Sequence, residues 1–170
     1  MSLTSTQLTT LKNDINADPV LAAYPNNSDG NFAISQAYTL TASPDFWVWK
    51  TYVTKADLVN STGPDGTTFT WVGNGFITRS AGEQSAWREL FNGTNAVNAA
   101  QANVRQAFAD IFSGTGNAAL NRTHLLAVGR RKASRVEKLF AAGTGSTASP
   151  AVMGFEGTLS YQDVEAARQS

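Results

Sequence analysis

Apolar residues recur at helical spacing along most of the chain, and this pattern predicts a mainly α protein. Leu8, Leu11 and Ile15 share one face of a predicted first helix, which Thr4 or Ser5 can cap. A proper capping box, Ser80-Ala81-Gly82-Glu83, begins a later helix. Predicted helices cover residues 4–17, 19–24, 28–40, 80–91, 98–112 and 160–168, joined by Gly-, Asn- and Pro-rich turns.

The longest helical pattern runs without interruption from Asn121 to Gly145. At 100° per residue its apolar positions form one broad arc, and its cations gather along one flank, apart from Lys132, which points into the arc. We expect one helix with an inner face and a basic outer face. The arc comprises Leu125, Leu126, Val128, Ala133, Val136, Leu139 and Phe140, and the basic stripe comprises His124, Arg131, Arg135 and Lys138.

The most aromatic segment holds Phe46, Trp47, Trp49 and Tyr52. Four large rings within seven residues are costly to leave in water, so we expect at least two of them in the core or at a subunit interface. Aromatic and β-branched residues follow a proline here, and the pattern leaves helix and strand both open.

The chain changes character after Gly143. A flexible, small-residue linker leads to a short extended or β segment at 152–159 and a final short helix. We therefore predict a small helical bundle over residues 1–143, followed by a linker and C-terminal arm over 144–170. Docking of the arm on a neighbouring subunit and packing on its own domain both remain open, and its predicted contact residues are Phe155, Leu159, Tyr161 and Val164.

Charge and composition narrow the function. The formal net charge is zero, 15 % of residues are charged, and the chain has no cysteine. Bulk charge argues against a free-standing nucleic-acid binder, and cysteine-ligated metal sites are excluded. A surface with few charges suits protein–protein contact. Neither a signal peptide nor an apolar run of membrane-spanning length is visible, so no membrane association is expected.

The sequence contains few residues or motifs that could carry out catalysis or bind a cofactor. His124 is the only histidine, and the chain lacks a G-x-S-x-G elbow and a phosphate-binding loop. The chain's glutamates have simpler roles as caps or surface charges than as glycosidase acids. We predict no enzymatic activity, no catalytic residue, no metal and no cofactor. For the basic stripe three interpretations stay open: a solvated face, a contact to an acidic partner, or non-specific contact with DNA phosphates.

Three segments carry a resemblance: DPVLAAYPN (18–26), SPDFWVWKT (43–51) and RRKASRVEKLFAAGTGSTASPAVMGFEGTLSYQDVEAAR (130–168). They resemble a family of proteins encoded among the virion genes of tailed bacteriophages. In size, helical character and C-terminal arm, the chain is also similar to the head–tail connector, or adaptor, proteins of the phage neck. That similarity is one of architecture.

The resemblance implies a structural virion protein located at the neck or head–tail junction and made in the host cytoplasm. It implies a closed homo-oligomeric ring, a dodecamer in the connector proteins, between the portal protein and a tail or stopper protein. A capsid decoration protein, a tail-completion protein and, from a different class, a small cell-wall-degrading phage enzyme are the alternatives.

Overall fold

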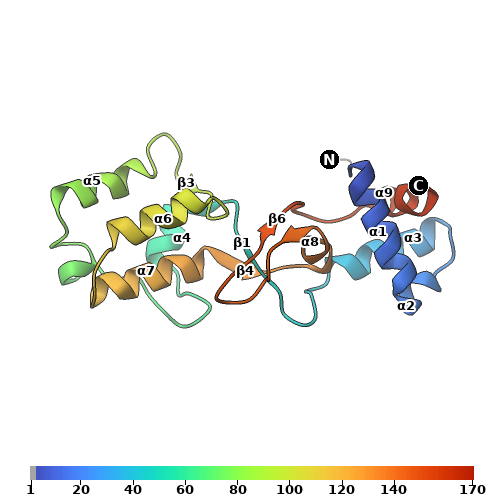
Figure 1. Ribbon diagram of the computed structural model, residues 1–170, viewed down its shortest axis with the longest axis horizontal. Helices are drawn as coiled ribbons and strands as arrows, with labels where there is room; N and C mark the ends of the chain where they lie inside the picture. The colour runs from blue at the N-terminus through green and yellow to red at the C-terminus, as the bar shows by residue number, and fades with distance from the viewer. Residues whose placement is uncertain (1–2) are drawn as a thin grey trace. The chain divides into compact units, whose positions relative to one another are not determined.

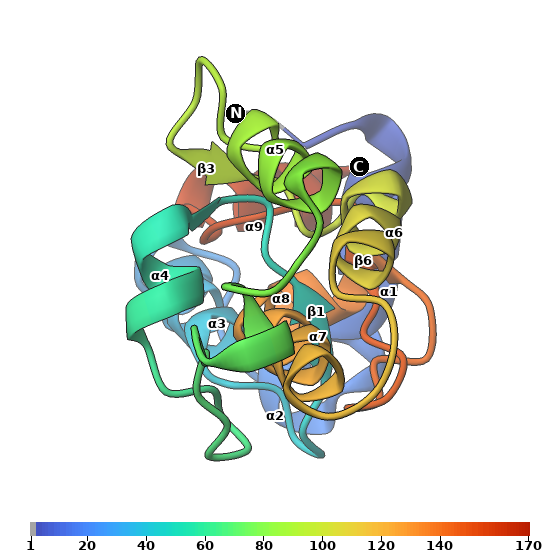
Figure 2. The same ribbon diagram turned by 90° about the vertical axis from the view of Figure 1, so that its left-hand side faces the viewer.

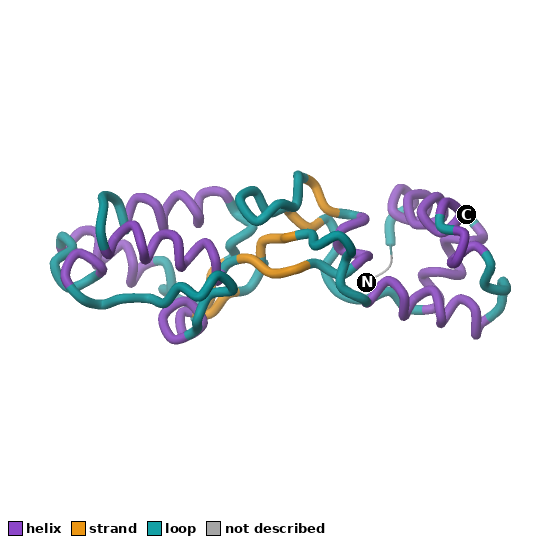
Figure 3. Tube along the Cα trace, turned by 90° about the horizontal axis from the view of Figure 1, so that it is seen from below, coloured by secondary structure: helices purple, strands orange, loops and turns teal. Residues whose placement is uncertain are grey.

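The computed structural model describes residues 3–170, and they form a mainly α protein whose sheets are short and two-stranded (Figures 1 and 3). This confirms the predicted fold class. The helices are α1 (Ser5–Ala17), α2 (Pro19–Ala22), α3 (Ser28–Thr39), α4 (Lys55–Asn60), the 3-10 turn η1 (Gly73–Gly75), α5 (Ala81–Glu89), α6 (Ala102–Ile111), α7 (Asn117–Val128), α8 (Arg135–Leu139) and α9 (Tyr161–Gln169).

The strands are only two or three residues long. Strand β2 (Val53–Thr54) pairs antiparallel with β3 (Ala96–Val97), and β5 (Ala141–Ala142) pairs antiparallel with β6 (Val152–Met153). The remaining sheet joins β1 (Trp47–Trp49) to β4 (Arg130–Lys132). The aromatic segment, left open between helix and strand, is therefore extended.

Side-chain caps determine where several helices begin. Capping boxes of the form Ser/Thr-x-x-Gln/Glu/Asp start α1, α4, α5, α8 and α9. In each box the first hydroxyl accepts from the N3 backbone N–H, and the N3 side chain accepts from the cap's own N–H. Both donors would otherwise lack a partner at a helix N-terminus.

The chain divides into two compact units. Unit 1 contains the residues up to 47 and those from 132 to the end, and unit 2 contains residues 48–131. In unit 1, helix α9 packs against α1 and α3, so the two ends of the chain share one core (Figure 1). Its buried apolar side chains include Leu11, Ile15, Leu21, Ile34, Tyr38, Val136, Leu159, Val164 and Ala167.

This division differs from the predicted boundary at residue 143. The segment expected as a linker and arm belongs to unit 1, where Val164 and Ala167 are 0 % exposed. Two apolar positions one turn apart on α9 are enough to bury one face of a short helix. Of the two alternatives, the structure has the segment packed on its own domain. Engagement of a neighbouring subunit by the exposed remainder stays a prediction.

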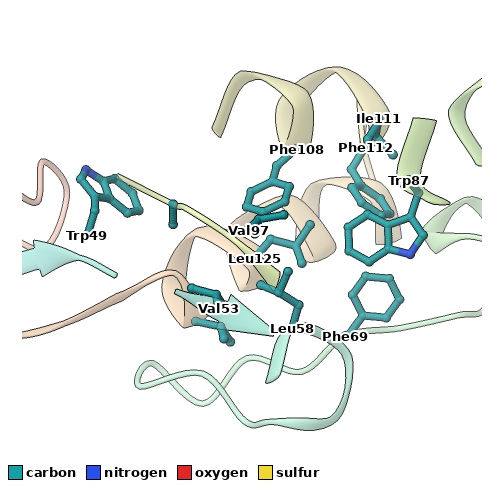
Figure 4. Close-up of a cluster of buried hydrophobic side chains, with 12 residues drawn as sticks. Trp49, Val53, Leu58, Phe69, Trp87, Val97, Phe108, Ile111, Phe112 and Leu125 are labelled. Atoms are coloured by element: carbon teal, nitrogen blue, oxygen red, sulfur yellow. The ribbon is translucent and has the colours of Figure 1, made fainter. Parts of the chain in front are cut away.

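Unit 2 is built around an aromatic core (Figure 4). Trp87 is 1 % exposed, and its ring lies edge-on to Phe112 at 5.3 Å and stacked on Phe69 at 5.9 Å between centroids. Such pairs stabilise beyond simple area burial. Helix α7 packs against α4 and α6, and α6 packs against α5 (Figure 2).

The prediction of a single helix within the pattern from Asn121 to Gly145 is wrong. Helix α7 ends at Val128, residues 130–132 are the strand β4, and a separate helix α8 begins after Ser134. Ser134 and Glu137 form a capping box, which starts a new helix at this point rather than continuing an old one. Lys132, the misfit of the helical pattern, instead pairs with Asp45 at 2.7 Å.

The burial of α9 predicts unequal effects of two truncations one turn apart. Val164→Ala removes two buried methyl groups from unit 1 and should lower the free energy of unfolding by about 2 kcal/mol. Tyr161→Ala, at a side chain 40 % exposed, should change it by less than about 0.5 kcal/mol. Urea unfolding followed by circular dichroism measures both. Equal, negligible effects would show that α9 is not part of the folded core.

Candidate interaction surfaces

The loop from Thr70 to Thr78 contains η1 and is held by one buried asparagine of α7. The Asn121 amide nitrogen donates to the carbonyl oxygens of Thr70 and Gly75, both at 2.9 Å. Its amide oxygen accepts from the Thr70 N–H at 2.8 Å. Because Asn121 is 0 % exposed, its side chain takes the place of water as the hydrogen-bond partner of these three backbone groups.

Further bonds fix the same loop. The Asn117 amide donates to the Val72 carbonyl at 2.9 Å, and the Asn74 amide donates to the Thr115 carbonyl at 2.8 Å. Within the loop, the Ile77 and Thr78 N–H groups donate to the carbonyls of Trp71 and Gly73. The loop backbone is therefore ordered without help from a partner.

The same loop exposes large apolar side chains. Val72 is 67 % exposed, Ile77 68 % and Trp71 43 %, and Leu120, one turn after Asn117 on α7, is 56 % exposed. We call these four residues the apolar knob. The Trp71 ring is anchored edge-on against Phe69 and Phe76, at 4.8 and 5.0 Å between centroids. Three of the four lie in one short loop, and exposed apolar residues close to a tryptophan are typical of protein–protein contact sites.

A second surface, in unit 1, centres on Arg135. Its guanidinium donates to Asp18 at 2.9 Å and to Asp14 at 3.0 Å, and lies 4.7 Å from the centroid of the Tyr38 ring. The hydrogen bond from Arg135 lowers the pKa of Asp18. Burial, reinforced by the hydrogen bond to Asp14, raises the pKa of Tyr38. The Arg135 guanidinium therefore has two carboxyl partners, and the raised pKa of Tyr38 keeps its phenol neutral at neutral pH.

Arg135, Asp14 and Asp18 line a groove of about 820 Å³, which we call the unit 1 groove. Its walls carry the exposed side chains of Val20, 67 % exposed, and Leu40, 66 % exposed. Its charged residues are two carboxylates and two cations, so its formal net charge is zero. The lining residues are Asp14, Asp18, Val20, Leu21, Ala37, Leu40, Thr41, Ala42, Ser43, Arg135, Lys138 and Leu139.

His124 does not lie on a basic outer face, contrary to prediction. It is 0 % exposed, with Nε2 at 2.8 Å from the Leu58 carbonyl oxygen and Nδ1 at 3.2 Å from the Thr67 hydroxyl. Because a carbonyl only accepts, Nε2 carries the proton. The single histidine thus connects α7 to α4 and to the turn at residues 62–68.

The other members of the predicted stripe lie on two further elements. Arg131 is in β4, whereas Arg135 and Lys138 are in α8. The helix break at residues 129–134 removes the common face that the pattern implied. Lys138 lines the unit 1 groove, with its Nζ 5.8 Å from the centroid of the Phe46 ring. Contact of these cations with DNA or an acidic partner stays a prediction.

The predicted interface aromatics have different environments. Trp49 belongs to the core of unit 2, with the Arg105 guanidinium 4.6 Å from its ring. Phe46 and Trp47 are half-buried, and the Phe46 ring packs directly on Gly145, where a Cβ would collide with it. Tyr52 is 69 % exposed. Only Trp49 is fully in a core, and an interface role for the others stays a prediction.

The predicted arm residues also divide. Leu159 and Val164 are buried in unit 1 and are unavailable for contact with another subunit, so this part of the prediction is wrong. Phe155 is half-buried against Phe140, at 5.8 Å between ring centroids. Tyr161 is 40 % exposed and accessible.

Two further features of residues 3–170 bear on other functions. No group of three or more histidine, aspartate or glutamate side chains in this range is placed to hold a metal ion. Every helix there is too short or too polar to cross a membrane. Comparison of the chain with protein-family models, with curated proteins and with solved structures found no match.

Sequence reasoning missed both surfaces. Of the large apolar side chains from Phe69 to Ile77, Phe69 is buried, whereas Trp71, Val72 and Ile77 are exposed. The available signal was Asn117 and Asn121, polar residues at i and i+4 of a helix beside a Gly-Asn-Gly turn. No local sequence pattern indicates the unit 1 groove, because Asp14 and Arg135, which form a hydrogen bond there, are 121 positions apart in the chain.

The hydrogen bonds of Asn121 predict a large effect of a small truncation. Asn121→Ala leaves three backbone groups of the loop without partners and should lower the free energy of unfolding by at least about 2 kcal/mol. Asn117→Ala, at a half-buried side chain with one such bond, is the matched control and should cost about 1 kcal/mol. Urea unfolding measures both. If the Asn121 variant were the more stable of the two, Asn121 would not be what holds the loop.

Proposed function

We propose that this chain is a non-enzymatic structural protein of a tailed-bacteriophage virion. Its proposed role is that of a head–tail connector, a ring of identical subunits between the portal protein and a tail or stopper protein. The resemblance of residues 18–26, 43–51 and 130–168 to proteins encoded among virion genes supports the virion setting. The mainly α fold is compatible with a connector.

The apolar knob is the observation that carries a contact role. A loop that exposes Trp71, Val72 and Ile77 has a hydrophobic cost in water, which contact with another protein removes. Its backbone is already ordered by Asn117 and Asn121, so docking loses little conformational entropy. Ordered apolar side chains without charge favour assembly over catalysis as the role of this surface.

The unit 1 groove supports the same proposal. Ionic groups whose charges are matched within one surface leave no charge unpaired when a neighbour covers them. The Arg135 guanidinium is ion-paired with both Asp14 and Asp18, so it keeps its partners when a neighbour covers the groove. A subunit with one contact surface on each unit has the two faces that ring closure requires.

Cryo-electron microscopy of virions from the phage that encodes this chain tests the proposal. We expect a ring of this protein between portal and tail, and particles without tails when Val72→Lys and Ile77→Lys are introduced together. A lattice of copies on the capsid surface would indicate decoration instead. Mature virions that lack the protein altogether would contradict a structural role.

A further inference from the structure

We propose that the unit 1 groove binds a peptide segment of a partner protein in which an aspartate or glutamate lies among aliphatic side chains. The carboxylate of the segment pairs with Lys138, and its aliphatic side chains cover Val20 and Leu40, which all line the groove. This inference rests on the proposed function for its setting, in which the segment belongs to a portal, tail or stopper protein. It adds the chemistry by which that partner is recognised.

The two carboxylates of the groove are already engaged. Arg135 donates to both Asp14 and Asp18. Asp14 also accepts from the Tyr38 hydroxyl, and Asp18 accepts from two backbone N–H groups at the start of α2. These acids therefore have little remaining need for a cation from a partner.

Lys138, by contrast, forms no ion pair with a carboxylate of residues 3–170. Its Nζ lies 5.8 Å from the centroid of the Phe46 ring. Asp45, next to that ring in the chain, pairs with Lys132, and Glu137 caps α8. Because Lys138 is half-buried, an uncharged surface that covered it would leave an ammonium without a counter-charge. A stable occupant of the groove must therefore supply an anion.

Two hydroxyl groups add to the donors of the groove. Thr41 and Ser43 line it with exposed side chains, whose hydroxyls make no hydrogen bond within residues 3–170. Thr41 forms a β-bridge with Ser134, and the Lys138 N–H donates to the Ser134 carbonyl one turn later at 3.0 Å. This pairing fixes the hydroxyl-bearing segment beside the first turn of α8. The groove thus combines one ammonium and two hydroxyls as donors, which a carboxylate can accept.

The walls of the groove require more than an anion. Val20 is 67 % exposed and Leu40 66 % exposed, and Leu21, Ala37 and Leu139 complete the apolar lining. A small carboxylate ion would leave these side chains in water. An amphipathic peptide segment covers them and supplies the anion on the same chain, which is how apolar grooves recognise peptides.

DNA phosphate is the other anion that Lys138 could meet. Duplex DNA carries one negative charge per about 1.7 Å of its axis, so it would bring phosphates close to Asp14 and Asp18 as well. The aliphatic walls offer nothing to a phosphate backbone. Of the three interpretations of the basic stripe, these observations favour contact with a partner protein for Lys138.

The test begins with a library of random twelve-residue peptides, displayed on yeast and selected on the purified full-length protein. Counter-selection uses a protein with Val20→Ser and Leu40→Ser, two exposed positions whose truncation leaves the core intact. Circular dichroism verifies the folding of every variant. We expect the enriched peptides to share an aspartate or glutamate flanked by aliphatic residues.

Fluorescence anisotropy then measures one enriched peptide and an analogue with glutamine in place of its acidic residue. Lys138→Gln should raise the dissociation constant of the parent peptide at least about 5-fold. The glutamine analogue should show the same loss on the wild-type protein and no further loss on Lys138→Gln, because both changes remove one ion pair. Lys138→Glu should prefer an analogue with lysine at that position.

Lys55→Gln is the matched control. Lys55 is also half-buried, with its Nζ 5.6 Å from the centroid of the Phe91 ring, but it belongs to unit 2 and does not line the groove. Its replacement should leave peptide affinity unchanged. An equal loss in both lysine variants would show a general effect of charge and overturn the proposed pairing.

Three further results would overturn the inference: no peptide that distinguishes the wild-type protein from the serine variant, an enriched consensus without an acidic residue, or unchanged affinity in Lys138→Gln. Displacement of the peptide by a DNA duplex at lower concentration than by unlabelled peptide would assign the groove to phosphate instead.

These assays contain no other phage component. Their failure would remove the proposed ligand of the groove while leaving the virion location intact. A protein missing from virions would remove the proposed function while leaving the measured peptide binding intact.

Discussion

The need to pair backbone polar groups beside the core of unit 2 governs the arrangement of this unit. Residues 61–78 form little regular structure, so their carbonyl and N–H groups must find partners outside helices and sheets. Helix α7 supplies them through Asn121 and His124, both 0 % exposed and on one face. With these bonds in place, Phe69 can enter the core while Trp71 and Val72 remain at the surface. The exposed position of the apolar knob thus depends on the hydrogen bonds that α7 makes to the loop backbone.

Local sequence signals predicted most helix positions. Thr4, Ser80 and Ser160 begin helices as expected, because capping depends on residues three positions apart. Apolar periodicity predicted one long helix after Asn121, and this prediction was wrong. Two local signals indicated a break instead: the Ser134–Glu137 capping box, and Lys132, which pointed into the apolar arc. Tertiary placement had no local signal. Nothing short-range places α9 beside α1, or Arg135 beside Asp14 and Asp18.

The two proposed contact surfaces share an electrostatic property. The knob has no charge, and the charged residues that line the unit 1 groove, Asp14, Asp18, Arg135 and Lys138, sum to zero. With 15 % charged residues and zero net charge, the chain has weak long-range repulsion between copies. Association would then depend on shape and apolar contact, which favours dense assemblies of identical subunits. The predicted basic stripe on one helix face loses its basis because the helix divides at residues 129–134.

The central claim is that α7 side chains hold the knob loop in its exposed conformation before any partner binds. Native-state hydrogen exchange, followed by NMR, measures this directly for the amides of Thr70, Ile77 and Thr78, which the structure pairs with Asn121, Trp71 and Gly73. The account predicts protection approaching that of buried amides in α7, with exchange through global unfolding. Exchange at the rate of an unstructured loop, in a protein whose α7 amides are fully protected, would contradict it.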